Sequence, residues 1–151
     1  MKSAATLNIE INDKQSVISG MTKKLAEIVE YVFAGAGVNS GEISMAIVSD
    51  DEMSELNARF FGYNETTDVI AFLYEQSEDG RRIDGEIIVN AMEAVRRSKE
   101  LMHGTEEELL FYAVHGALHL LGREDSSAEK REAMNRHAAL LLSEKGVEIE
   151  I

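Results

Sequence analysis

The sequence predicts a single α+β domain over residues 1–151, with about four strands and about five helices. Three observations support this prediction. The chain has 151 residues, which is a common size for one domain. It contains no proline, so no proline-rich linker divides it. Its apolar residues also switch repeatedly between the two-residue period of strands and the longer period of helices.

The first half of the chain is expected to contain two strands and two helices. Residues 6–13 alternate apolar and polar side chains, as a half-buried strand does. Residues 16–37 carry apolar side chains at helical spacing and end in two glycines. A short apolar run at 43–48 predicts the next strand. Asp50 or Asp51 then caps a helix with an apolar side.

The middle of the chain predicts a loop, two more strands and a third helix. Residues 61–68 are polar and contain Gly and Asn, which favours a loop. Strands are expected at 68–74 and 85–89, joined by a charged connection rich in turn-forming residues. Helical spacing then runs through 90–102. The tail at 147–151 could add a small edge strand.

Two capping signatures predict where the last two helices begin. Thr105 and Glu108 form a T-x-x-E capping box before an apolar run, and Gly122 is a natural end for that helix. Ser126 and Glu129 repeat the signature before the final helix. Residues 123–125 are therefore expected in a short turn between two helices.

Composition excludes several classes of function. The net charge of −13 argues against broad, non-specific attachment to nucleic acid, although it leaves room for a local basic site. The absence of cysteine excludes disulfides, thiolate zinc sites and a cysteine nucleophile. No stretch approaches the roughly 18 apolar residues of a membrane span, and the N-terminus lacks a secretory signal pattern. A cytoplasmic protein is expected.

The segment HGALHLLGRED, residues 115–125, has the spacing of a metal site. His115 and His119 are four residues apart on a predicted helix, so both imidazoles can face one point. Gly122 permits a left-handed turn that could bring Asp125 to the same point as a third ligand. Three protein ligands leave a position for water or substrate, as in catalytic zinc sites.

Histidines at this spacing also occur as capping, surface or core residues. The surrounding helix is otherwise apolar, which makes histidines without partners costly and favours the metal hypothesis. His103 and His137 are weaker candidates, because they lie near a helix end and among polar residues. Zinc is the expected ion, and another divalent transition metal is an alternative.

Several segments together resemble the YbeY family of metal-dependent endoribonucleases of ribosomal RNA maturation. They are the core HGALHLLG, its preceding EELLFYAVHG, and the upstream ELNARFFGYNETTDVIAF and GEIIV. The resemblance covers almost the whole chain. It implies a four-stranded mixed sheet with helices packed on it and a zinc-like ion on the zincin-like histidine helix. It also implies single-stranded ribosomal RNA as substrate, with components of the small ribosomal subunit as partners.

The chain departs from the family pattern at two positions that matter for chemistry. Family members usually have a third histidine where this chain has Asp125, and an arginine where it has Phe61. The nearest arginine is Arg59, two positions earlier and therefore on a different side of the helix. Arg59 and Asp68 are the candidate catalytic residues, and Glu86 is a second carboxylate that could shape the pocket.

The sequence is also compatible with two other functions. A non-catalytic ribosome assembly factor would keep the fold with a weakened metal site, and the substitutions at Phe61 and Asp125 favour it. A zinc peptidase shares the H-x-x-x-H-x-x-G-x-x-D spacing. Such peptidases carry a glutamate directly after the first histidine as general base, and this chain has Gly116 there.

Overall fold

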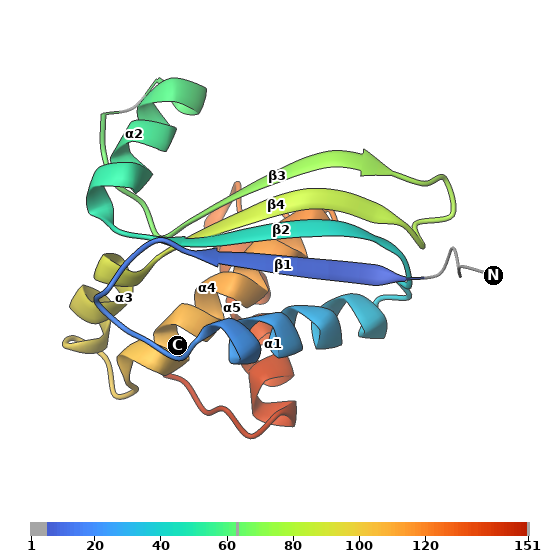
Figure 1. Cartoon of the computed structure of the whole chain (residues 1–151). Helices are drawn as coiled ribbons and strands as arrows, with labels where there is room; N and C mark the ends of the chain where they lie inside the picture. Colours follow the sequence, from blue (N-terminus) through green and yellow to red (C-terminus); the bar gives the residue numbers. More distant parts are fainter. Residues whose placement is uncertain (1–5, 63, 151) are drawn as a thin grey trace.

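A computed structural model describes residues 6–62 and 64–150 (Figure 1). Its strands and helices occur in the expected order. They are β1 (Leu7–Asp13), α1 (Thr22–Gly35), β2 (Gly41–Val48), α2 (Asp50–Phe61), β3 (Val69–Gln76), β4 (Ile83–Asn90), α3 (Ala91–Ser98), α4 (Thr105–Leu120) and α5 (Ala128–Glu144). The predicted α+β class is confirmed, with four strands and five helices among the described residues.

The four strands form one mixed sheet in the order β1-β2-β4-β3. Strands β1, β2 and β4 are parallel, and β3 pairs antiparallel with β4. This arrangement leaves β3 at the edge of the sheet. Residues 64–68, which precede β3, therefore lie at the same end of the sheet as the C-terminal end of β4, where Val69 pairs with Val89.

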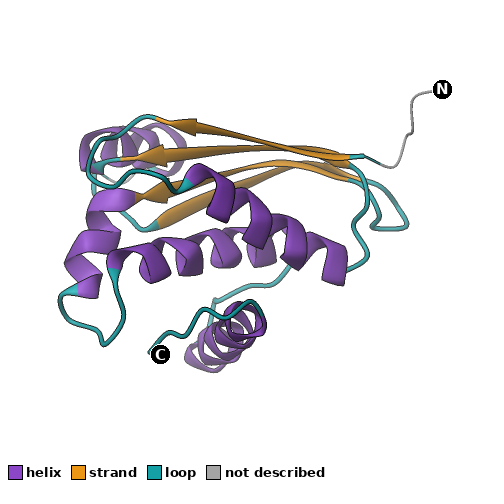
Figure 2. Cartoon of the chain, turned by 60° about the horizontal axis from the view of Figure 1, so that its bottom comes forward, coloured by secondary structure: helices purple, strands orange, loops and turns teal. Residues whose placement is uncertain are grey.

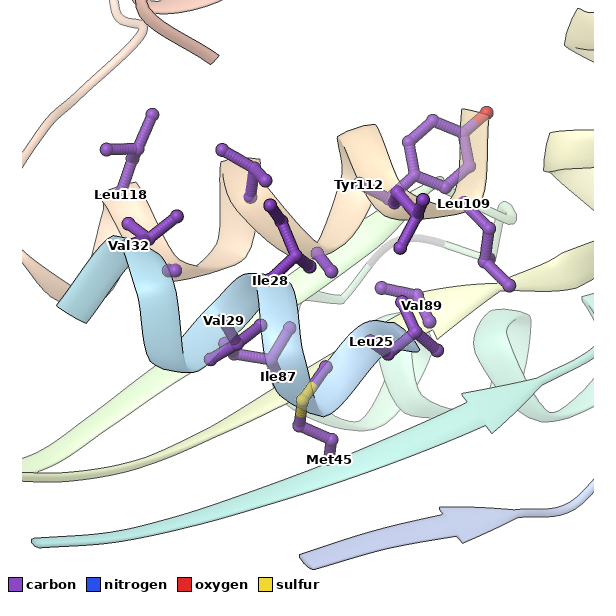
Figure 3. Close-up of a cluster of buried hydrophobic side chains, with 14 of the residues drawn as sticks. Leu25, Ile28, Val29, Val32, Met45, Ile87, Val89, Leu109, Tyr112 and Leu118 are labelled. Carbon is purple, nitrogen blue, oxygen red and sulfur yellow. The ribbon is translucent and has the colours of Figure 1, made fainter. Parts of the chain in front are cut away.

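Helices cover the two faces of the sheet unequally (Figure 1). One face packs against α1 and α4, and α5 lies outside α4, as the turned view shows (Figure 2). The main apolar core lies in this layer and includes Val29, Ile87 and Tyr112 (Figure 3). The other face has a smaller core under α2, built around Met53 and Ile88. No helix in the described part of the chain is long and apolar enough to span a bilayer.

Helix α4 approaches the sheet closely because Gly116 has no side chain. A Cβ atom at this position would lie 2.5 Å from Ile87 Cγ2 and 3.3 Å from Val69 Cγ2. The face of α4 that carries Gly116 is therefore in direct contact with β3 and β4. The histidines on either side of it, His115 and His119, are held near the start of the edge strand.

Both predicted capping boxes are wrong by one residue. The N-cap of α4 is Gly104, whose backbone N–H donates to Glu107 Oε1 at 2.9 Å. Thr105 already belongs to the helix, and Glu108 is buried, where its Oε1 lies 2.5 Å from His103 Nε2. Glu108 is thus used in a tertiary contact and not in a cap.

The last helix and the third helix also differ from expectation at their ends. The N-cap of α5 is Ser127, whose Oγ accepts from Lys130 N at 3.1 Å, in place of Ser126. Helix α3 ends at Ser98, four residues before the predicted end. Its last turn is closed by a bond from Ser98 Oγ to Val95 O at 2.8 Å.

The expected edge strand in the tail is wrong for residues 147–150, and Ile151 lies outside the described residues. The tail instead crosses the loop before α4. Glu150 N donates to His103 Nδ1 at 2.8 Å, and Glu150 Oε2 accepts from Met102 N at 2.7 Å. His103 therefore has a partner at each ring nitrogen and serves to join the tail to Glu108.

Candidate metal centre

The turn after α4 brings Asp125 back to His119. Gly122 has a φ of +91°, a left-handed conformation that glycine adopts without strain, so its predicted role in ending the helix is confirmed. Arg123 N then donates to Leu118 O at 3.0 Å, which fixes the turn. As a result, His119 Nε2 and Asp125 Oδ2 are 3.8 Å apart. Two donors about 2.1 Å from one ion can be at most about 4.2 Å apart, so this pair is compatible with a shared ion.

His115 lies one turn earlier and is more deeply buried. Its Nε2 is inaccessible to solvent and has no hydrogen-bond partner among the described residues. The Phe111 ring packs against the imidazole, with ring centroids 4.3 Å apart. The side chain of Asn135, on α5, approaches His115 closely enough to favour its protonated form, although the geometry is not that of a hydrogen bond. A buried polar atom without a partner is costly, so His115 Nε2 is an available donor atom for a cation.

Burial lowers the pKa of His115, while Asp68 and Asn135 act in the opposite direction. The neutral imidazole is the form that binds metal, so this shift favours ligation at neutral pH. The donor set of two imidazoles and a carboxylate fits a zinc-like ion in its chemistry. However, no three of the His, Asp and Glu side chains in residues 6–62 and 64–150 are arranged as a metal site. The contact between His119 and Asp125 is the part of the expected tripod that the structure brings together.

The lowered pKa of His115 predicts that the metal-free protein loses stability in mild acid. The unfolded chain takes up this proton near pH 6.5, and the folded chain resists it, so unfolding is favoured as the pH falls below about 6.5. Each pH unit should cost up to about 1.4 kcal/mol until the folded-state pKa is reached. Urea denaturation at pH 7.5 and pH 5.5 should show a smaller loss for His115→Gln than for the unsubstituted protein. Equal losses would contradict the prediction.

Asp68 is placed beside this site by the start of β3. Its Oδ1 accepts from Val69 N at 2.7 Å and from Thr67 Oγ1 at 3.3 Å. Its backbone oxygen accepts from Asn90 N at 2.9 Å, which ties it to the end of β4. The carboxylate is also the largest electrostatic influence that favours the protonated form of His115. Asp68 thus lies within electrostatic range of His115.

A buried polar network fixes the segment that carries Asp68. Asn90 is fully buried and donates from Nδ2 to Asp50 Oδ1 at 2.9 Å, Thr66 Oγ1 at 2.9 Å and Thr67 O at 3.1 Å. Both Asp50 oxygens accept from Arg96, each at 2.7 Å. The Arg96 guanidinium holds the pKa of Asp50 far below its usual range. No local sequence pattern predicts this network, because its members come from three distant segments.

Arg59 and Glu86 lie away from the histidines. Arg59 Nη2 pairs with Glu55 Oε1 at 3.4 Å and lines a hollow near Lys14, on another side of α2. Glu86 accepts a hydrogen bond from Tyr74, and this contact raises the pKa of Tyr74 to about 12. Glu86 lies on the face of the sheet opposite Ile87, the residue that contacts α4. The structure therefore brings neither residue to the candidate centre.

A groove of about 430 Å³ lies beside the edge strand, and His119 is one of the residues that line it. Its walls come from α2, β3 and the last turn of α4, and they include Asn57, Phe61, Thr67, Ala71, Leu73 and His119. Phe61, at the position of the family's arginine, thus faces the space next to the candidate centre, whereas Arg59 does not.

The other two histidines have partners elsewhere. His103 directly precedes the N-cap of α4, so it lies near a helix end as predicted, but its side chain is almost entirely buried between Glu108 and the tail. His137 Nδ1 lies 2.6 Å from Arg123 Nη1. Burial and Arg123 lower the pKa of His137. Among the described residues, neither His103 nor His137 joins His115 and His119 in a group that could hold a metal ion.

Comparison with known proteins assigns the chain to a family. The family model described as endoribonuclease YbeY matches residues 8–146. This chain belongs to the YbeY family. The endoribonuclease YbeY of Bacillus subtilis (strain 168) is 32% identical over 153 residues, which cover 94% of this chain and 98% of that protein.

A second relative and a solved structure are also similar to this chain. The endoribonuclease YbeY of Aquifex aeolicus (strain VF5) is 32% identical, with 72% of this chain and 73% of that protein covered. The solution structure of a Thermotoga maritima protein matches with a TM-score of 0.61 and 30% identity, and covers 91% of both chains. The YbeY assignment made from the histidine helix and its neighbouring segments is confirmed.

Proposed function

We propose that this YbeY-family chain is a metal-dependent endoribonuclease that cuts single-stranded RNA. Its proposed substrate is ribosomal RNA of the small subunit during maturation in the cytoplasm, and its proposed ion is zinc. The family match over residues 8–146 supports this proposal. The single structural observation that carries it is the His119–Asp125 contact, which lies one turn from the buried Nε2 of His115.

His115, His119 and Asp125 are the proposed ligands. A zinc ion held there would polarise a phosphate oxygen or supply hydroxide at neutral pH. The chain's own residues prepare the site for this role. Burial keeps His115 neutral and therefore able to bind, and the Phe111 ring restricts the orientation of its imidazole. The Gly122 turn positions the Asp125 carboxylate.

Asp68 is the proposed acid–base residue. It lies near His115, and its Oδ1 is held by Val69 N, so the carboxylate has a defined orientation. A carboxylate in this place can accept a proton from an attacking hydroxyl group or water. Arg59 has no proposed role in the centre, because its partner is Glu55 and it lines a separate hollow.

The peptidase alternative lacks support in the geometry. Peptidases with this ligand spacing place their general base directly after the first histidine. Here that position is Gly116, and a side chain at this position would collide with Ile87 in the sheet. The residue after His115 thus faces the core and not the site.

A non-catalytic assembly factor is the second candidate. The observation that favours it is that the described residues contain no preformed group of three metal-binding side chains. Such a protein would bind RNA or a ribosomal component without cutting it. The two candidates make opposite predictions for cleavage by the zinc-loaded protein.

Cleavage of a labelled RNA of about 20 nucleotides tests the proposed function. We expect the zinc-loaded protein to cut the single strand, to leave the same sequence intact as a duplex, and to lose activity after chelation until zinc is restored. His115→Ala and His119→Ala should be inactive although folded, as judged by circular dichroism. Binding of the single strand without cleavage at any zinc concentration would overturn the nuclease and support the assembly factor.

A further inference from the structure

Two exposed aromatic side chains occupy the end of α2, and one of them is placed to receive a ligand. Phe60 and Phe61 are 54% and 48% exposed, although aromatic residues of this size are usually buried. Phe61 lies parallel to Phe72, with an interplanar angle of 3° and centroids 5.9 Å apart. Phe60 meets Phe72 edge to face instead, with an interplanar angle of 61°. Phe72 therefore fixes the plane of Phe61 and leaves much of that ring exposed.

The groove beside the exposed ring of Phe61 also reaches His119 of the candidate metal centre. Phe61 of α2 and His119 of α4 line the same groove, together with residues of the edge strand β3. Phe60 does not line this groove. A volume of about 430 Å³ lies within the range of roughly 300–1,000 Å³ that small-molecule sites occupy. The groove is thus large enough for one flat ring system.

The chemistry of the walls favours an uncharged, flat group. Of the residues that line the groove, His119 alone is ionisable, and the others are apolar, hydroxyl or amide side chains. The phosphate backbone of RNA is normally met by Lys and Arg. Nearby cations of this acidic chain are already paired, as Arg59 is with Glu55 and Arg96 with Asp50. An aromatic platform without cations suits a nucleobase better than a phosphate.

We propose that an unpaired base of the RNA substrate stacks on the ring of Phe61, in the groove that leads to His119. This inference rests on the proposed endoribonuclease function and specifies how its substrate is held. A base within a duplex is covered by its neighbours on both faces, whereas an unpaired base offers a free face to an aromatic side chain. Phe61 is therefore a specificity-determining residue that favours single strands.

The test measures binding of fluorescently labelled octa-adenylate and octa-uridylate by anisotropy, in chelator so that the RNA is not cut. Phe61→Leu keeps an apolar side chain but removes the flat ring, and we expect it to bind octa-adenylate roughly 5- to 100-fold more weakly. Phe61→Trp should retain or improve binding. Phe60→Ala is the matched control, since it removes a neighbouring ring outside the groove, and its affinity should stay within about twofold of the unsubstituted protein.

A second series replaces each nucleotide in turn with an abasic residue. When the abasic residue replaces the nucleotide whose base stacks on the ring, Phe61→Leu should cause no further loss of affinity. The two changes then remove the same interaction. Equal affinity of Phe61→Leu and the unsubstituted protein would overturn the inference while leaving cleavage, and thus the proposed function, intact. Absence of both RNA binding and cleavage in the unsubstituted protein would overturn the proposed function itself. Backbone amide shifts at Val69–Leu73 on addition of an extended peptide, with no effect of Phe61→Leu on RNA, would assign the groove to a peptide strand instead.

Discussion

Replacing Asp125 with alanine is expected to weaken zinc binding by at least about 100-fold, whereas Asp125→His should preserve it. The turn at Gly122 places Asp125 Oδ2 3.8 Å from His119 Nε2, where either a carboxylate or an imidazole can serve as a ligand. Loss of a residue that hydrogen-bonds to a metal ligand, and so only orients it, already lowers metal affinity by about 10- to 100-fold. Loss of a ligand itself should therefore lower the affinity by more than this. Competition with a chromophoric zinc chelator measures the three affinities.

The same three proteins distinguish a working substitution from a lost site. A neutral imidazole leaves more positive charge on the ion than a carboxylate does, so Asp125→His should move the pH–rate profile for RNA cleavage to lower pH. Glu124→Ala is a suitable control, because Glu124 lies in the same turn as Asp125 but pairs with Lys130 of α5. Equal zinc affinity of Asp125→Ala and the unsubstituted protein would show that Asp125 is not a ligand and would favour the assembly factor.

Asn90→Ala is expected to produce the largest loss of stability, about 2–4 kcal/mol. Its Oδ1 accepts from Met92 N at 2.9 Å as the cap of α3, and loss of such a cap costs about 0.5–2 kcal/mol. Its buried amide also holds Asp50 and Thr66, and groups left unsatisfied cost about 1–3 kcal/mol more. Thermal denaturation should show a melting temperature lower by roughly 5–15 °C.

Asn90→Ser separates the two contributions. Serine is a good helix cap but cannot supply the amide donors, so its loss of stability should lie between those of the unsubstituted protein and Asn90→Ala. Because the network also fixes the segment before β3, both variants should change the position of Asp68 relative to His115. A loss below about 0.5 kcal/mol for Asn90→Ala would mean that the network is replaced by water at little cost.

The order and type of the elements could be predicted from the sequence because they depend on local periodicity. Helix boundaries were less predictable. The T-x-x-E signature at Thr105 and Glu108 is a local pattern, but Glu108 contacts His103, whose other ring nitrogen binds the tail. Competition from a buried tertiary partner moved the cap to Gly104 and Glu107. No pattern within four residues contains this information.

The candidate site, too, was only partly predictable from the sequence. The spacing of His115 and His119 on one helix, followed by a glycine, was enough to place them and to predict the turn that carries Asp125. The approach of Asp68 and Asn135 to His115 depends on how β3 and α5 pack against α4. The position of Phe61 in the groove is likewise a result of tertiary packing. These features could not be predicted from spacing within a single segment.

Gly116 separates the proposed metal ligands from the proposed acid–base residue. The residue between the two histidines is pressed against Ile87, so α4 has no room there for a side chain that could take up a proton. Asp68 lies on a different element, at the start of β3, and is held by backbone atoms of the sheet. The proposed ligands and the proposed acid–base residue therefore belong to segments about 50 residues apart along the chain. Each can change through substitutions in its own segment without rebuilding the other.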